Sequence, residues 1–163
     1  MPTTTTEPRV GARVLLLDAH DRVLLIHARD PDDPAHHWWE LPGGGLDNNE
    51  TLTAAAQREV AEESGIVLTG LDRKLWTRES RFTYRGQQHH RLDHVFLAKI
   101  QDTSPTVSVK PTANERAGLI ERRWFTAAEL DLTVDKLLPA TLPALLNQLL
   151  AGHFPAGPIR LTD

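Results

Sequence analysis

One predicted helix, over Thr51–Ser64, most constrains how this chain can fold, because acidic residues continue the side of it that should pack. Alanine, a strong helix former, carries its middle. Asn48 or Asn49 is expected to cap its start, and Gly65 followed by Ile66 is a good stop signal. The chain therefore has to place this helix against other elements without burying unpaired charge.

The acids in question are Glu59, Glu62 and Glu63, which lie within ~100° of one another at 3.6 residues per turn. The packing positions Leu52, Ala55 and Ala56 project onto the same side as Glu59 and Glu63. Acids near a helix C-terminus are disfavoured by ~0.3–1 kcal/mol each, and like charges four residues apart repel. Arg58 is the one cation nearby in the local sequence. The pattern favours a bound divalent cation over the alternative, an ordinary solvated acidic face.

The chemistry of the expected cation follows from the donors. Mg²⁺ takes oxygen ligands and is typically shared with substrate phosphates, whereas zinc prefers nitrogen and sulfur. The chain has no cysteine, which excludes disulfides, thiolate zinc sites and a cysteine nucleophile. The run Gly43-Gly44-Gly45, expected to be an irregular turn, lets backbone approach a ligand, and no GK[ST] follows it, so a P-loop is excluded.

Hydrophobic runs and turn signals place the remaining elements. Strands are expected at Arg13–Leu17 and Val23–His27 (a hairpin), Trp38–Leu41 (extended, after a loop over Asp30–His37), Leu75–Tyr84 and His89–Ile100 (a second hairpin), and Arg123–Phe125. A helical turn is expected at Ala127–Leu130 and an amphipathic helix at Leu138–Ala151. The order β-β-α-β-β-(β)-α predicts an α/β or α+β sandwich with a mixed sheet.

Length and charge limit the organisation and the partners. With 163 residues we expect one domain over residues 9–152, a disordered leader over residues 1–8 and a C-terminal coil tail over residues 153–163. The net charge of −4 gives no electrostatic footprint for nucleic acid or an anionic membrane, and no apolar run approaches the ~20 residues of a membrane span. We expect a cytoplasmic protein whose last helix packs on its own sheet or contributes to a homodimer.

Gly44, Glu50 and the run REVAEESGI over residues 58–66 resemble the Nudix box, GX5EX7REUXEEXGU, at every fixed position. The flanking segments Trp39–Gly44 and Arg123–Phe125 also look like this MutT-like family. The resemblance implies an α/β/α sandwich and a hydrolase acting on a nucleoside diphosphate linked to another moiety, with Mg²⁺ or Mn²⁺ as cofactor. The substrate stays open among nucleoside triphosphates, dinucleoside polyphosphates and nucleotide sugars.

The resemblance also assigns roles. It implies that Glu59 and Glu63 are the principal metal ligands, that Glu62 binds directly or through water, and that the Gly43 carbonyl adds another ligand. Arg58 would orient the carboxylates, while Gly44, Glu50 and Gly65 would hold the loop and helix together. The general base would be a glutamate of the box or one on a later loop, with Glu115 the first loop candidate and Glu121 the second.

Several aromatic and histidine residues are weaker candidates. One of Trp38 and Trp39 should be core and the other exposed to stack on a base, and we favour Trp39 as the contact; Tyr84 and His94 are further substrate candidates. The adjacent pairs His36-His37 and His89-His90 are expected on the surface, because neighbours on an extended chain face apart. The alternatives to an enzyme are a catalytically silent nucleotide-binding or regulatory module, and a structural protein whose acids only solubilise a helix.

Overall fold

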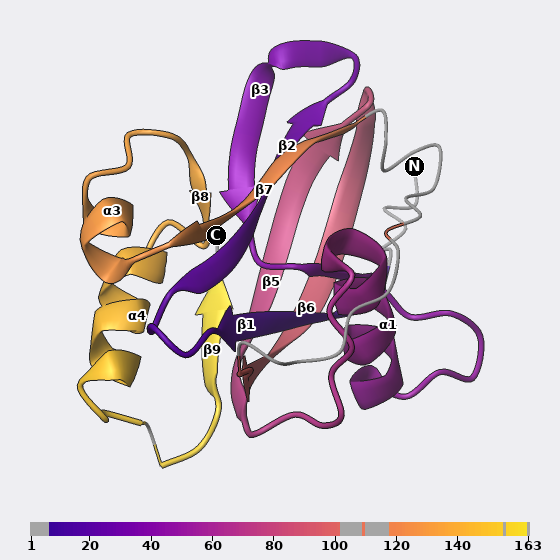
Figure 1. The fold of residues 1–163 in the computed structure, drawn as a ribbon. Coiled ribbons are helices and arrows are strands. Elements are labelled where there is room, and N and C mark those ends of the chain that lie inside the picture. The colour runs from indigo at the N-terminus through magenta and orange to yellow at the C-terminus, as the bar shows by residue number, and fades with distance from the viewer. Residues whose placement is uncertain (1–6, 102–108, 110–117, 155, 163) are drawn as a thin grey trace.

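The computed structural model describes residues 7–101, 109, 118–154 and 156–162, and shows a mixed sheet with helices on both faces (Figure 1). The strands are β1 (Arg9–Leu17), β2 (Val23–Asp30), β3 (Asp33–Glu40), β4 (Gly43–Gly45), β5 (Lys74–Tyr84), β6 (Gln87–Lys99), β7 (Leu119–Phe125), β8 (Leu137–Leu138) and β9 (Ile159–Thr162). The helices are α1 (Leu52–Ser64), α3 (Ala127–Asp131) and α4 (Leu142–Leu150).

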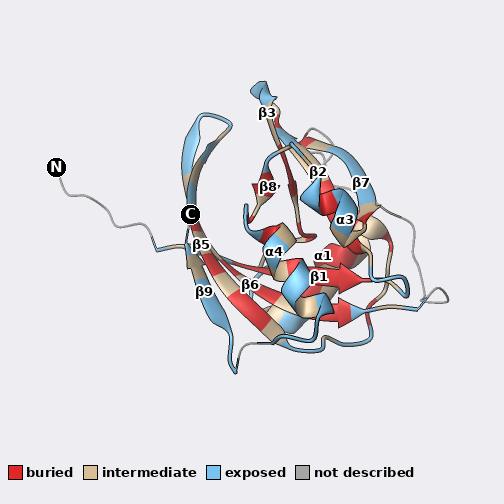
Figure 2. Cartoon of the chain, turned by 90° about the vertical axis from the view of Figure 1, so that its left-hand side faces the viewer, coloured by how far each residue is buried: buried red, intermediate tan, exposed pale blue. Residues whose placement is uncertain are grey.

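The sheet has the order β8-β3-β2-β1-β6-β5-β9, with β4 also paired to β1 and β7 to β2. Strands β1 and β6 run parallel at its centre, whereas β2–β3 and β5–β6 are antiparallel hairpins. The two hairpins project from the sheet in the same direction (Figure 2). The expected hairpin β5–β6 and the strand around Trp124 are confirmed. The expected hairpin of β1 with β2 is antiparallel but pairs only at Leu17 and Val23, because β2 pairs along most of its length with β3 and β7 instead.

Two hydrophobic clusters, one on each side of the sheet, form the core. One joins strand residues to Ala55, Ala56 and Val60 of α1. The other joins strand residues to Leu130 of α3 and to Leu142 and Leu146 of α4. The central strands are accordingly mostly buried, while the hairpin ends are exposed (Figure 2). The predicted α/β sandwich with a mixed sheet is confirmed.

The predicted cap of α1 was wrong, although its end was confirmed. Thr51, with an extended ψ of 160°, caps the helix, and its Oγ1 accepts from the backbone N–H of Ala54 at 3.1 Å. Asn48 and Asn49 lie too early because a cap must directly precede the first helical residue. Gly65 adopts the left-handed conformation at φ 79° and ends the helix.

Two expected loops before α1 are strands. Most of the expected loop Asp30–His37 belongs to the β2–β3 hairpin. Its prolines are tolerated because Pro31 lies in the turn, and Pro34 lies at the register shift, where a backbone N–H is not needed for pairing. The three glycines form β4, which pairs with residues 11–13 of β1. Their lack of side chains allows this close pairing beside other backbone.

The C-terminal part also differs from expectation. Helix α4 begins at Leu142 rather than Leu138, because β8 precedes it and Pro143 suits a first turn. Within the expected coil tail, β9 forms a strand parallel to β5. Residues 1–6 of the expected leader lie outside the described residues, and the division into leader, domain and tail stays a prediction. No helix among the described residues is long and apolar enough to cross a bilayer.

Candidate active site

Arg58 is the central cation of the acidic end of α1. Its Nε and Nη2 donate to both carboxylate oxygens of Glu50 at 2.8 and 2.9 Å, and its Nη1 donates to Glu59 at 2.9 Å. Nη1 also reaches Glu62 at 3.3 Å, and Nη2 reaches the Gly45 carbonyl at 3.0 Å. These bonds lower the pKa of Glu50 to about 2, with the Arg58 bond as the main cause and the Asp47 N–H bond next. One guanidinium thus fixes residues of the loop and of the helix.

Glu59 and Glu63 are buried carboxylates, with 8% and 7% of their surface exposed, whereas Glu62 is half-buried. Burial raises the pKa of Glu63 well above its usual value; Arg13 opposes this rise, and the neighbouring charges of Glu59 and Glu40 add to it. Two buried anions on one helix face carry a desolvation cost that a cation would relieve. The arrangement therefore has the charge and the donors of a cation site.

The glycine strand β4 presses directly against these acids. The Gly43 N–H donates to Glu63 Oε1 at 3.1 Å, and a Cβ on Gly44 would lie 2.6 Å from Glu59 Oε1. Gly43 has φ 153°, and a Cβ there would meet the Ala12 carbonyl oxygen at 2.3 Å. Gly43 must be glycine because backbone already occupies the space of a Cβ, and at Gly44 a Cβ would displace the Glu59 carboxylate.

Behind β4, a buried ion network joins β1 to β6. Arg13 Nε lies 3.3 Å from Asp93 Oδ2, and its Nη1 donates to the Leu41 carbonyl at 2.7 Å and lies 3.4 Å from Glu40. Burial raises the pKa of Asp93, but the charges of Arg13 and Arg91 outweigh it and hold the pKa below its usual value. Arg13 also places positive charge near Glu63.

A cavity of about 990 Å³ opens beside the acids and extends to the ends of both hairpins. Its lining includes Glu59 and Glu63 together with five arginines, namely Arg9, Arg13, Arg78, Arg81 and Arg91. Burial lowers the pKa of Arg78 to about 10, which leaves it charged near neutral pH. The aromatic residues Trp38, Phe82 and Tyr84 line the same space. The cavity therefore combines acidic, basic and aromatic surfaces.

Sequence reasoning missed these arginines as a group. They lie on β1, β5 and β6, and only the parallel pairing of β1 with β6 brings them together. It also missed Arg122 of β7, whose guanidinium donates to the Glu63 carbonyl and so places a cation at the C-terminal end of α1. The signal available was the unusual density of arginine in predicted strands, which single-strand patterns do not interpret.

The candidate substrate residues are dispersed. Trp39 is a core residue that stacks on His27 at 4.3 Å and packs edge-on against Phe125. This placement opposes the expected base contact, and the expectation of one exposed tryptophan was wrong because Trp38 is buried as well. Trp38, unlike Trp39, does line the cavity, and so does Tyr84, 6.2 Å from it between ring centroids. His94 of β6 is absent from the lining described for this cavity.

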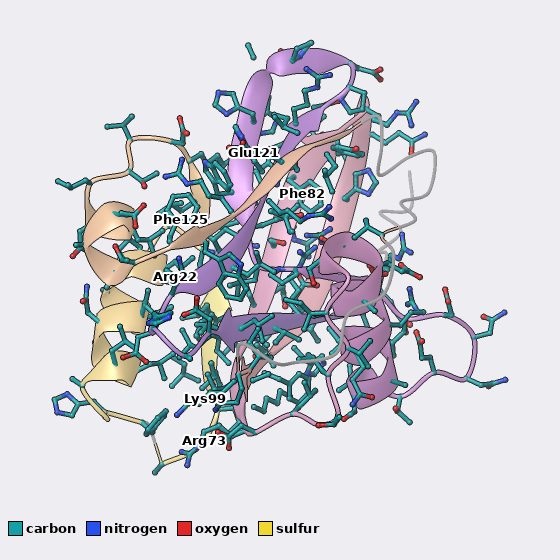
Figure 3. The ribbon with its side chains drawn as sticks, in the orientation of Figure 1. Arg22, Arg73, Phe82, Lys99, Glu121 and Phe125 are labelled. Carbon is teal, nitrogen blue, oxygen red and sulfur yellow. The ribbon has the colours of Figure 1, made fainter. Side chains whose placement is uncertain are left out.

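The two candidate bases on later segments fare differently. Glu115 lies outside the described residues. Glu121 is exposed on β7 and lies opposite His27 of β2. In Figure 3, Glu121 lies at the end of β7 nearer the β2–β3 hairpin, and Phe125 lies at the end nearer α3. The adjacent histidines also differ from expectation, because His37 is half-buried and its Nδ1 lies 3.0 Å from His27 Nε2.

The residues around α1 fit a hard divalent cation. Their donors are carboxylate oxygens, with the backbone of Gly43 adjacent, and this is the donor set that Mg²⁺ and Mn²⁺ prefer. The two buried carboxylates of α1, Glu59 and Glu63, also border the cavity. A cation held by them would therefore be accessible to a ligand in that cavity.

Known proteins that resemble this chain are hydrolases with a mixed sheet between helices. The NUDIX domain family model matches residues 7–146. The chain is 30% identical over 146 residues to an RNA pyrophosphohydrolase of Novosphingobium aromaticivorans, covering 78% of this chain and 82% of the relative. This chain therefore belongs to the Nudix family, and it is a pyrophosphohydrolase of the Nudix type.

Solved structures show the same fold. The MutT protein of Methanosarcina mazei Go1 superposes with a TM-score of 0.63 at 18% identity, covering 91% of this chain and 98% of that one. The NUDIX domain of Shewanella oneidensis NrtR, complexed with ADP ribose, gives 0.62 at 17% identity and covers 93% and 92% of the two chains. At these identities the likeness concerns the fold alone.

Proposed function

We propose that this protein hydrolyses a diphosphate bond in a nucleotide-type substrate, using Mg²⁺ or Mn²⁺ held by the acids of α1. The observation that carries the proposal is the burial of Glu59 and Glu63 at the border of a cavity that arginines also line. A phosphate chain needs cationic partners, and the arginines together with a cation on the carboxylates supply them. The local positive charge along the cavity thus contrasts with the net charge of −4 of the whole chain.

The ligand assignment extends the same geometry. Glu59 and Glu63 are proposed as the principal ligands, Glu62 as a direct or water-mediated ligand, and the Gly43 carbonyl as another. When bound, the cation neutralises phosphate oxygens and lowers the pKa of an attacking water. Arg58 holds Glu59 in position through its 2.9 Å bond, and Glu50 holds Arg58 in turn.

The remaining residues bind and orient the substrate. Arg9, Arg78, Arg81 and Arg91 line the cavity and are proposed to bind phosphate oxygens, while Arg13 holds the buried network behind them. Trp38 and Tyr84 offer aromatic surface for a nucleoside. Water attacks phosphorus, the phosphoanhydride P–O bond breaks, and a carboxylate takes the proton of the water. That base is a glutamate of the box, or else Glu115 or Glu121.

A 5′-phosphorylated RNA end is a second candidate substrate, because the matched relative is an RNA pyrophosphohydrolase. A small nucleotide such as ADP ribose, the ligand of the Shewanella domain that shares this fold, is the other candidate. If the substrate is a small nucleotide, the expectation of no nucleic-acid partner holds, and if it is an RNA end, that expectation is wrong. Cytoplasmic location and a homodimer stay predictions as well.

The test is a substrate panel with identification of each product. The panel contains nucleoside triphosphates, dinucleoside polyphosphates, nucleotide sugars, ADP ribose and a 5′-triphosphorylated oligoribonucleotide, each with Mg²⁺ and with Mn²⁺. We expect cleavage of a phosphoanhydride bond in at least one class, and none with EDTA. Nucleotide binding without turnover on the whole panel would support the catalytically silent module. Neither binding nor turnover would favour the structural alternative.

A further inference from the structure

A second group of metal-ligand side chains lies away from the acids of α1. His27 of β2, His37 of β3 and Asp135, in the connection between α3 and β8, each present one ligand atom, and these atoms all lie within 4.8 Å of one another. His27 Nε2 and His37 Nδ1 are 3.0 Å apart. Three ligands from three separate segments thus converge on one point.

The surrounding residues hold these ligands in place. The His27 ring stacks on Trp39, 4.3 Å between centroids and 14° between planes, and meets the His37 ring edge-on at 5.1 Å. The Trp39 Nε1–H donates to Asp135 Oδ2 at 3.1 Å and so orients that carboxylate. Metal ligands in proteins typically have such an outer hydrogen-bond partner, which fixes their orientation.

The spacing suits one ion. Two nitrogens 3.0 Å apart, each bound at ~2.05 Å, subtend roughly 95° at the ion, an ordinary angle between neighbouring ligands. The charge is mixed, since Glu121 lies directly across from His27 on β7, whereas the Arg123 cation lies over the Trp39 ring at 5.6 Å and also acts on His27. The Asp135 carboxylate, whose ligand atom lies within 4.8 Å of both imidazole ligand atoms, supplies negative charge beside them.

We propose that His27, His37 and Asp135 bind a divalent transition metal of the Zn²⁺ class, at a site separate from the acids of α1. Two imidazoles and one carboxylate suit zinc and its neighbours, whereas Mg²⁺ prefers an all-oxygen set. Three protein ligands leave at least one position for water. The proposal does not depend on which substrate the protein hydrolyses.

Binding at this site would fix one rim of the cavity. Asp135, Lys136 and Leu137 line the cavity, and the Lys136 carbonyl accepts from the Trp39 N–H at 2.9 Å. An ion shared by Asp135 and the two histidines would link the segment between α3 and β8 to the β2–β3 hairpin, in addition to the backbone bond from Trp39 to Lys136. The metal therefore acts as a clamp between two walls of the cavity.

The test is calorimetric titration of Zn²⁺ into the whole protein in excess Mg²⁺, with the absorption spectrum of bound Co²⁺ as a second readout. We expect one equivalent bound by the native protein, with affinity falling by more than ~100-fold in His37→Gln and in Asp135→Asn. An asparagine oxygen still accepts from Trp39, so the latter variant keeps that contact. Circular dichroism and the melting temperature check the fold of each variant.

The matched control is His36→Gln, which removes the neighbouring histidine on the same strand and should leave Zn²⁺ binding unchanged. Glu59→Gln should also leave it unchanged, which separates the site from the acids of α1. Equal affinity in native protein, His37→Gln and Asp135→Asn would overturn the proposal. So would loss of Zn²⁺ binding in Glu59→Gln, or displacement of the ion by Mg²⁺.

Discussion

The backbone N–H of Gly43 donates to Glu63 Oε1 at 3.1 Å, which joins residues that lie 20 positions apart in the chain. The bond ties the glycine strand β4 to the acidic face of α1. The close approach of Gly44 to Glu59 repeats the connection one residue later. The distance between loop and helix is therefore set by backbone on one side and by carboxylates on the other.

This relationship makes Gly44 a sensitive position. We expect Gly44→Ala to lower hydrolysis by ~100-fold, because the new Cβ would lie 2.6 Å from Glu59 Oε1 and a displacement of about 1 Å at a site costs that much. Gly70→Ala is the control, since nothing lies within 4 Å of its added Cβ. Steady-state rates and melting temperatures of both variants check the prediction. Similar rates for both would contradict it.

The buried charge of Glu63 predicts an effect on stability without metal. Its raised pKa means that the folded state disfavours the charged form, so above the unfolded pKa of about 4.5 the carboxylate costs stability. At pH 7 in EDTA, Glu63→Gln should therefore be as stable as the native protein or more so. Added Mg²⁺ should raise the melting temperature of the native protein but not that of Glu63→Gln. Exposed Glu7, changed to Gln, should alter neither result, and a clear destabilisation of Glu63→Gln in EDTA would count against the account.

Arg58 should not tolerate lysine. A lysine cannot reproduce the two-pronged contact with Glu50 while also reaching Glu59. Arg58→Lys should lower the free energy of unfolding by roughly 1–3 kcal/mol, the range for partners left unsatisfied, and reduce the hydrolysis rate. Denaturant unfolding measures the first effect.

The control is Arg22→Lys, whose guanidinium contacts Asp18 at 2.7 Å near a surface turn. The Arg22 side chain is 42% exposed, against 26% for Arg58, and an ion pair made by a cation so exposed contributes about 0–1 kcal/mol. Equal losses in the two variants would show that Arg58 is an ordinary surface cation.

The depressed pKa of Asp93 predicts acid sensitivity. Its folded pKa lies below its ordinary 3.8, so the stability that it contributes is fully present above pH 3.8 and is lost as the pH falls through the folded value. Asp93→Asn should lower stability near neutral pH and flatten its dependence on pH below about 4. Unfolding curves between pH 2 and 7 measure this. An exposed Asp33→Asn control should keep the native slope, and an unchanged slope in Asp93→Asn would refute the assignment.

The sequence predicted the local elements well. The alanine run and Gly65 define α1, and apolar runs around the turn at Arg85-Gly86 define the hairpin β5–β6, because these signals lie within a few residues of one another. It failed at Gly43–Gly45, where a strand forms only because β1 offers an edge. It failed similarly at Ile159–Thr162, which pairs with β5 from about 80 residues away.

The candidate site divides in the same way. The acids of α1 were predicted because helical periodicity places them on one face. The contact of Arg13 with Asp93, 80 residues away, depends on the parallel register of β1 and β6, which no local pattern specifies. Trp38 and Trp39 show a second limit, since alternation separated their faces correctly but both faces are covered.

The most direct test of the central claim is the rate of phosphoanhydride hydrolysis against Mg²⁺ concentration, for the native protein and for Glu59→Gln and Glu63→Gln. The account predicts a saturable Mg²⁺ dependence in the native protein and a loss of several orders of magnitude in both variants, with the fold retained. A native rate in Glu63→Gln, or hydrolysis that persists in EDTA, would contradict it.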